Sequence, residues 1–197
     1  MRRICGEAGF TLVEMLTVML IMGVVMTGIT TLFVQGSNAE VDMNQRFQAQ
    51  LNARLALDRL RREAHCASTA TTSSTTLTLT VATTCPGSGG TTSIKWCLLS
   101  SGGRYALFRQ TGAGACATTS NKYADYVVYS ASNTYFALQP NSTATLAKIY
   151  VCIPVNIKSA SLRSVDTYGL RDVLVMRNST RTGTPGTPVT FPTTCPG

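Results

Sequence analysis

The sequence predicts an α+β protein, in which a long N-terminal membrane-spanning α-helix is packed on a C-terminal antiparallel β-sheet domain. Three observations predict it: a nearly uncharged apolar run over residues 10–34, a helical repeat of apolar residues over 35–66, and alternating segments beyond residue 67. A helical part followed by a run of strands is typical of the α+β class. We expect four segments, namely 1–9, 10–34, 35–66 and 67–197.

The apolar run contains 25 residues from Phe10 to Val34, and Glu14 is its only charged residue. About 20 such residues cross a bilayer core as a helix. A carboxylate at mid-bilayer costs roughly 2.5–3.5 kcal/mol, so an acid in this run calls for a cationic partner. Arg2 and Arg3 precede the run. They predict a single-pass protein of the inner membrane with its C-terminal domain outside.

The stretch that opens the run is Gly9-Phe10-Thr11-Leu12-Val13-Glu14-Met15-Leu16. It resembles the processing signature of type IV prepilins and of the pseudopilins of type II secretion and DNA uptake. The resemblance implies that residues 1–9 are a leader peptide, and that a prepilin peptidase cuts between Gly9 and Phe10 and methylates the new amine.

The same resemblance implies how the protein assembles. Glu14 would pair with the Phe10 amine of a neighbouring subunit, so the partners are other pilins, met through their N-terminal helices. Membrane lipid surrounds the helix before assembly, and the filament then lies at the cell surface or in the periplasm. The helix positions that would pack along the bundle are Leu12, Val13, Leu16, Met19 and Leu20. The alternative is an ordinary membrane anchor with a chance glutamate.

Residues 35–66 continue the helix in amphipathic form. Apolar residues recur at helical spacing as Met43, Phe47, Leu51 and Leu55, and as Ala53, Leu57, Leu60 and Ala64. We expect this part to pack mostly on its own domain. Gly36 should bend or melt the helix, because glycine costs about 1 kcal/mol in a helix interior.

Beyond residue 66 the pattern is that of strands. Residues 67–75 are predicted to be a Ser/Thr-rich linker, and residues 110–122 a loop. Alternation predicts strands over 76–81, 93–99, 104–109, 126–129, 135–138, 148–153 and 173–177, and the tail from 182 has no pattern. The order of these elements is similar to that of PilW-like minor pilins and J-type pseudopilins.

Seven cysteines are present, and Cys5 would leave with the leader. The six that remain are Cys66, Cys85, Cys97, Cys116, Cys152 and Cys195. An even set in an exported domain predicts disulfides. We expect three, with Cys195 tying the tail to the sheet, although sequence does not choose the connectivity. No metal site is expected, since no Cys-x-x-Cys occurs and the single histidine, His65, adjoins Cys66.

One histidine and nine acidic residues leave little for acid–base catalysis. No phosphate-binding loop with Lys-Ser/Thr occurs, so neither an enzyme nor a cofactor is expected. The chain carries a net charge of +8, and about +7 once the leader's +1 is removed.

Three functions remain. The first is a minor pilin or pseudopilin that starts or caps a filament. The alternative is a filament-borne DNA receptor that combines scattered basic residues with Trp96, Tyr105 and Phe108, since single strands bind charged grooves and stacking rings. A stand-alone membrane-anchored domain would require that processing never happens. Sequence does not choose between pilus, type II secretion and competence machines.

Overall fold

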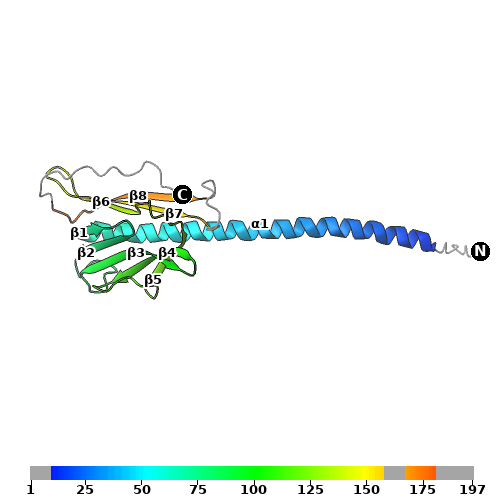
Figure 1. Cartoon of the computed structure of the whole chain (residues 1–197), viewed down its shortest axis with the longest axis horizontal. Helices are drawn as coiled ribbons and strands as arrows, with labels where there is room; N and C mark the ends of the chain where they lie inside the picture. The colour runs from blue at the N-terminus through cyan, green and yellow to red at the C-terminus, as the bar shows by residue number, and fades with distance from the viewer. Residues whose placement is uncertain (1–9, 158–166, 181–197) are drawn as a thin grey trace, which may run out of the picture. The chain divides into compact units, whose positions relative to one another are not determined.

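The computed structural model describes residues 10–157 and 167–180 of the chain. The chain divides into two compact units, Met1–Asn44 and Gln45–Gly197. One helix, α1 (Leu12–Cys66), supplies the described structure of the first unit and the beginning of the second (Figure 1). An antiparallel sheet follows it in the second unit. The α+β prediction is therefore confirmed.

The helix of the first unit is not interrupted at Gly36, so that prediction is wrong. Residues on both sides of Gly36 are helical, and a Cβ built on it would meet nothing within 4 Å. Neither packing nor backbone geometry requires glycine here. The cost of about 1 kcal/mol is small beside the cooperativity of helix propagation, in which each added residue gains a hydrogen bond.

The second unit begins with the last turns of α1, whose inner face is made mainly of small residues. The buried positions of this helix are Ala49, Ala53, Ala56, Leu57, Leu60, Glu63 and Ala64. Alanines let the helix backbone lie close to the sheet, and Leu57 and Leu60 fill the space between them. This spacing is the helical period that marks a buried face.

Eight strands follow in the described residues. Their bounds are β1 Ala67–Thr72, β2 Thr76–Val81, β3 Ser93–Ser101, β4 Arg104–Thr111, β5 Asn121–Val127, β6 Phe136–Gln139, β7 Lys148–Val155 and β8 Tyr168–Val175. All pairs are antiparallel, in the order β1-β2-β3-β4-β5-β7-β6, with β8 also paired to β7.

The sheet consists of two parts, which are joined by a single residue pair. Strands β1–β5 form one part and β6–β8 the other, and β5 meets β7 through the single pair Val127 and Val155. The C-terminal part of α1 lies between these two parts (Figure 1). Large side chains from both parts are fully buried against it, among them Trp96 from β3, Phe136 from β6 and Leu174 from β8.

Two segments predicted to be irregular contain strand residues, which corrects the sequence interpretation. Residues 67–72 form β1, paired to β2 from Ala67↔Val81 to Thr72↔Leu77. Their low hydrophobicity mimics a linker, but threonine favours the pleated surface of a strand. The loop predicted over 110–122 is also too long, because β5 begins at Asn121 and ends at Val127, earlier than the 126–129 strand predicted from its tyrosines.

Candidate assembly site

The N-terminal turn of α1 is capped by Thr11, which lies in the stretch that resembles a processing signature. Thr11 precedes the helix, and its Oγ1 accepts a hydrogen bond from the backbone N–H of Glu14 at 3.3 Å. Thr11 therefore acts as an N-cap, satisfying one of the orphan amide donors of the first turn. The acid at position 14 also suits the positive end of the helix dipole. The Thr-x-x-Glu spacing thus has a local role in starting the helix.

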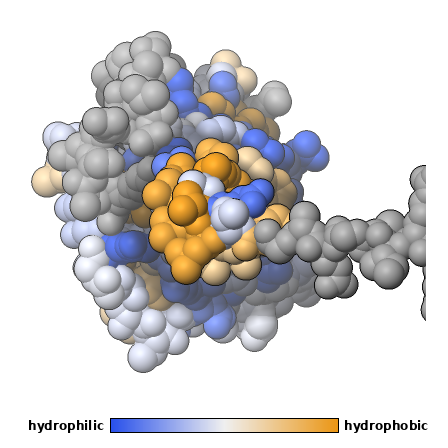
Figure 2. Space-filling view, turned by 90° about the vertical axis from the view of Figure 1, so that its right-hand side faces the viewer, coloured by the Kyte–Doolittle hydropathy of each residue, from blue (hydrophilic) through white to orange (hydrophobic). Residues whose placement is uncertain are grey.

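The apolar residues that follow are exposed on all sides of the helix. Every large hydrophobic side chain from Leu12 to Val34 is at least half exposed, including Leu16 at 60% and Leu20 at 64%. Figure 2 is viewed from the right-hand side of Figure 1, and hydrophobic residues gather in the middle of that view. By length and composition the N-terminal part of α1 could cross a membrane, and none of that window is buried. A helix that is hydrophobic all round calls for lipid or other helices.

The hydroxyl groups in this run are satisfied within the helix itself. Thr27 donates to the carbonyl of Gly23 and Thr30 to that of Met26, each at 2.8 Å. Thr31 donates to the carbonyl of Gly28, also at 2.8 Å. A polar group left unpaired in hydrocarbon would cost several kcal/mol. The Glu14 carboxylate is different, since no described cationic side chain forms an ion pair with it.

A second set of apolar side chains is exposed on the part of α1 that belongs to the domain. Phe47 is 61%, Leu51 40% and Leu55 58% exposed. These three residues, the outer stripe, follow one another every four positions and lie on one helix face. We expected residues 35–66 to pack mostly on the domain, and these three residues are exceptions, as is Met43, which is 70% exposed. The alanine-rich face occupies the contact with the sheet instead.

A family model describing the prokaryotic N-terminal methylation motif matches residues 5–30. The N-terminus of the chain is therefore similar to that of a type IV pilin. This motif is the class III signal peptide shared by type IV pilins and pseudopilins. It points to a structural subunit, and together with the apolar helix it fits a membrane-anchored pilin-like protein. No curated protein and no solved structure matches the chain.

The matched segment holds the residues predicted for processing and assembly, Gly9, Phe10 and Glu14. Phe10 is 76% exposed just before α1, and Glu14 is exposed in its first turn. Gly9 lies outside the described residues.

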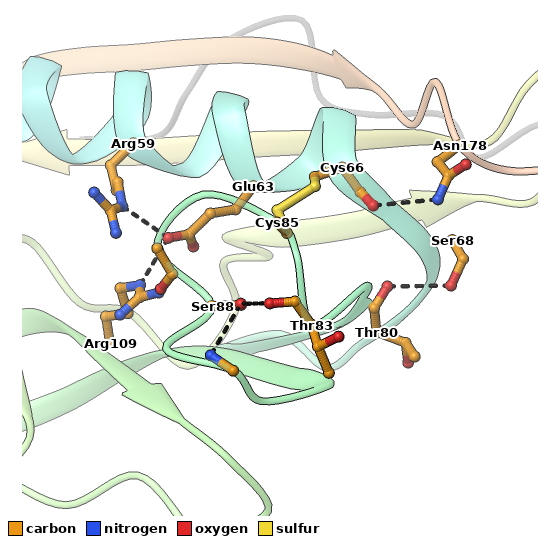
Figure 3. Close-up of a disulfide and its surroundings, with 12 residues drawn as sticks. Arg59, Glu63, Cys66, Ser68, Thr80, Thr83, Cys85, Ser88, Arg109 and Asn178 are labelled. Carbon is orange, nitrogen blue, oxygen red and sulfur yellow. Dashed lines mark hydrogen bonds and ion pairs between the residues drawn. A yellow bond between two sulfur atoms is a disulfide. The ribbon is translucent and has the colours of Figure 1, made fainter.

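Sequence reasoning missed a buried charged cluster that fastens the helix to the sheet. Glu63 is fully buried, and its Oε1 accepts hydrogen bonds from Nε of Arg59 and Nε of Arg109, each at 2.8 Å (Figure 3). Its Oε2 accepts from Nε1 of Trp96 at 2.8 Å. One signal was available, because Glu63 stands at the helical spacing of the buried Ala56 and Leu60.

This cluster also holds the loop that follows β2. Nη2 of Arg109 donates to the carbonyl of Gly87 at 2.6 Å. Cys85, two residues earlier, is bonded to Cys66, the last residue of α1. A buried charge left without its partner typically costs about 3–5 kcal/mol. Among the described residues no buried side-chain nitrogen or oxygen lacks a hydrogen-bond partner. The buried polar groups that join the loop to the end of the helix are therefore all paired.

Four of the six cysteines form two disulfides. Cys66 bonds Cys85, and Cys97 of β3 bonds Cys116 in the connection between β4 and β5. Cys152 is also disulfide-bonded. Cys195 and Cys5 lie outside the described residues. No group of three or more described His, Cys, Asp or Glu residues is arranged to hold a metal ion.

The cysteines carry a testable expectation. Protein taken from the cell envelope should show Cys66–Cys85, Cys97–Cys116 and a third bridge, Cys152–Cys195, because those are the two cysteines left after the leader is removed. Each bridge typically contributes about 2–4 kcal/mol by restricting the unfolded chain. Peptide mapping without reduction measures this. Free thiols at Cys152 and Cys195 would contradict the third bridge.

The aromatic residues proposed for DNA binding are mostly unavailable. Trp96 is 0% and Phe108 1% exposed, so neither ring can stack on a base. Tyr105 is half-buried and stacks on Tyr129 with ring centroids 4.1 Å apart. The prediction that these three rings contact DNA is therefore wrong for Trp96 and Phe108, because both side chains are buried in the core.

Proposed function

We propose that the protein is a minor subunit of a type IV pilus or a related pseudopilus, which assembles through α1 after removal of residues 1–9. The observation that carries the proposal is the wholly exposed apolar helix under the methylation motif, with one carboxylate five residues beyond the expected cut. Once cut, the chain would begin with the Phe10 amine. That amine, on a neighbouring subunit, is the cation that Glu14 lacks within the described chain.

The outer stripe supports the same role outside the apolar run. Phe47, Leu51 and Leu55 lie on the same uninterrupted helix as that run, on the domain's surface rather than in its core. Burying each of these side chains would contribute roughly 1.5–3 kcal/mol at most. We infer that the helix of another pilin-type subunit packs on the outer stripe. The reason is that the outer stripe lies on the same helix as the assembly motif.

A photo-crosslinking amino acid at position 51 tests this proposal in cells. Activated by light, it should join the protein to chains that carry the same N-terminal methylation motif, identified by mass spectrometry of the product. The matched control is position 173, where Val173 is also exposed, at 50%, but lies on β8. Only uncrosslinked protein from position 51, or equal yields from both positions, would contradict a helix-mediated contact.

A further inference from the structure

A cavity of about 410 Å³ lies beside the C-terminal turns of α1. Its described lining is Arg59, Arg62, His65, Cys66 and Pro86. Two guanidinium groups and an imidazole thus line it, and no carboxylate-bearing residue is among the described lining. The volume falls within the roughly 300–1,000 Å³ typical of small-molecule sites. Neither filament assembly nor the buried Glu63 cluster accounts for a basic cavity here.

Two contacts hold the walls of this cavity in place. Cys66 and Cys85 fasten the helix end to the loop that carries Pro86. Arg109 holds the carbonyl of the next residue, Gly87, at 2.6 Å. A Cβ at Gly87, whose φ is +86°, would collide with the guanidinium of Arg59. Glycine is therefore favoured by the backbone conformation of the turn, and it leaves room for that guanidinium. A preformed site of this kind binds without a large ordering cost.

The two arginines keep donors for a ligand. Arg59 gives its Nε to Glu63, which fixes the orientation of the guanidinium fork while part of the side chain stays exposed, at 32%. Arg62 pairs with Asp58 at 2.8 Å, but these side chains are 67% and 53% exposed. Such exposed pairs contribute only about 0–1 kcal/mol. Arg62 can therefore exchange Asp58 for a better acceptor at little cost.

The surroundings of His65 add positive potential. Burial lowers the pKa of His65, and Arg177 and Arg61 lower it further, while Asp172 acts in the opposite direction. Basic residues in a last helical turn are also stabilised by the helix dipole. That effect applies to His65 in the last turn, but it does not explain why Arg59 and Arg62, which lie earlier in the helix, line the same cavity.

We propose that this cavity binds a phosphate-type oxyanion, with Arg59 and Arg62 donating hydrogen bonds to its oxygens beside His65. The planar guanidinium fork matches the geometry of a tetrahedral oxyanion. A bound anion favours the imidazolium, so binding raises the pKa of His65. By linkage, protonation of His65 strengthens binding as the pH falls, whereas protonation of the phosphoryl group, whose second pKa is about 6, opposes it. The ligand class is a phosphoryl group, whether free, on a nucleic acid strand or on a lipid headgroup.

The single histidine makes the test direct. The full mature chain in detergent, with its histidine ring carbon-labelled, is titrated with inorganic pyrophosphate near the usual His pKa of about 6.5. A saturable shift of the His65 signal and a raised pKa are expected. Arg62→Gln should weaken binding about tenfold, as loss of one charge-assisted hydrogen bond does. Arg104→Gln removes the same charge outside the cavity lining and should change affinity little.

Two results would overturn the proposal. One is a His65 signal that sodium chloride of equal ionic strength moves as far as pyrophosphate does. The other is equal affinity in wild type and Arg62→Gln, with near-ultraviolet circular dichroism showing both folded.

Competition against bound pyrophosphate identifies the source of the phosphoryl group. Displacement by a thymidine oligonucleotide indicates nucleic acid, and displacement by phosphatidylglycerol but not by phosphatidylcholine, each added to the detergent micelles, indicates lipid. Displacement by neither indicates a free phosphate compound.

Discussion

Gly9→Val is expected to accumulate as the uncut precursor, with residues 1–9 still attached. The peptidase must reach the bond between Gly9 and Phe10, and glycine allows the closest approach to a backbone because it has no Cβ. A branched side chain at the cut obstructs that approach, so almost no mature protein should form. Intact-mass spectrometry of membrane protein measures the ratio of precursor to mature chain.

Ala8→Val is the matched control for that experiment. It adds bulk one residue earlier and leaves the residue at the cut unchanged, so normal processing is expected. Mature protein from Gly9→Val at the wild-type level would show that the bond after Gly9 is not the one cut.

Glu14→Val should be processed and kept in the membrane, yet should enter filaments poorly. Membrane insertion gains from losing a carboxylate, whereas assembly loses the acceptor for the Phe10 amine of the neighbour. A hydrogen bond to a charged group contributes about 1.5–3 kcal/mol, so incorporation should fall at least about tenfold. The helix start is spared, because Thr11 Oγ1 accepts from the backbone N–H of residue 14 rather than from its side chain.

Two further substitutions at position 14 distinguish the effect of the negative charge from that of side-chain length. Glu14→Asp keeps the charge on a shorter side chain and should be intermediate. Glu14→Gln keeps the length and removes the charge, and should resemble Glu14→Val. The measurement compares the protein in membrane and sheared-filament fractions. Equal incorporation of wild type and Glu14→Val would contradict the pairing, unless the protein sits at the filament tip, where no neighbour lies ahead of it.

The features that the sequence predicted well are those with a strong local signal. An apolar run with one acid and a specific N-terminal motif predicted both the helix and its class. Alternation predicted β2, β3 and β4 to within two residues at either end. The strand β1 lacked large apolar residues, so its pairing partner, rather than its own composition, determines its structure.

The remaining features depend on which helix face meets the sheet. Two apolar stripes on residues 43–64 were equally visible, and only the fold shows that the alanine-rich one is buried while Phe47, Leu51 and Leu55 are exposed. The same choice of face buries Glu63 and places Arg59 between that carboxylate and the basic cavity. Helical spacing alone does not decide between two such faces, because both satisfy the same period.

The mass of the N-terminal peptide from protein in sheared filaments tests the central claim most directly. The account predicts a chain that begins at Phe10 and carries one extra methyl group on its amine, recovered together with other chains of the same N-terminal type. A chain that retains residues 1–9 and is found only in the membrane fraction would contradict it. That result would favour a stand-alone membrane-anchored domain over a filament subunit.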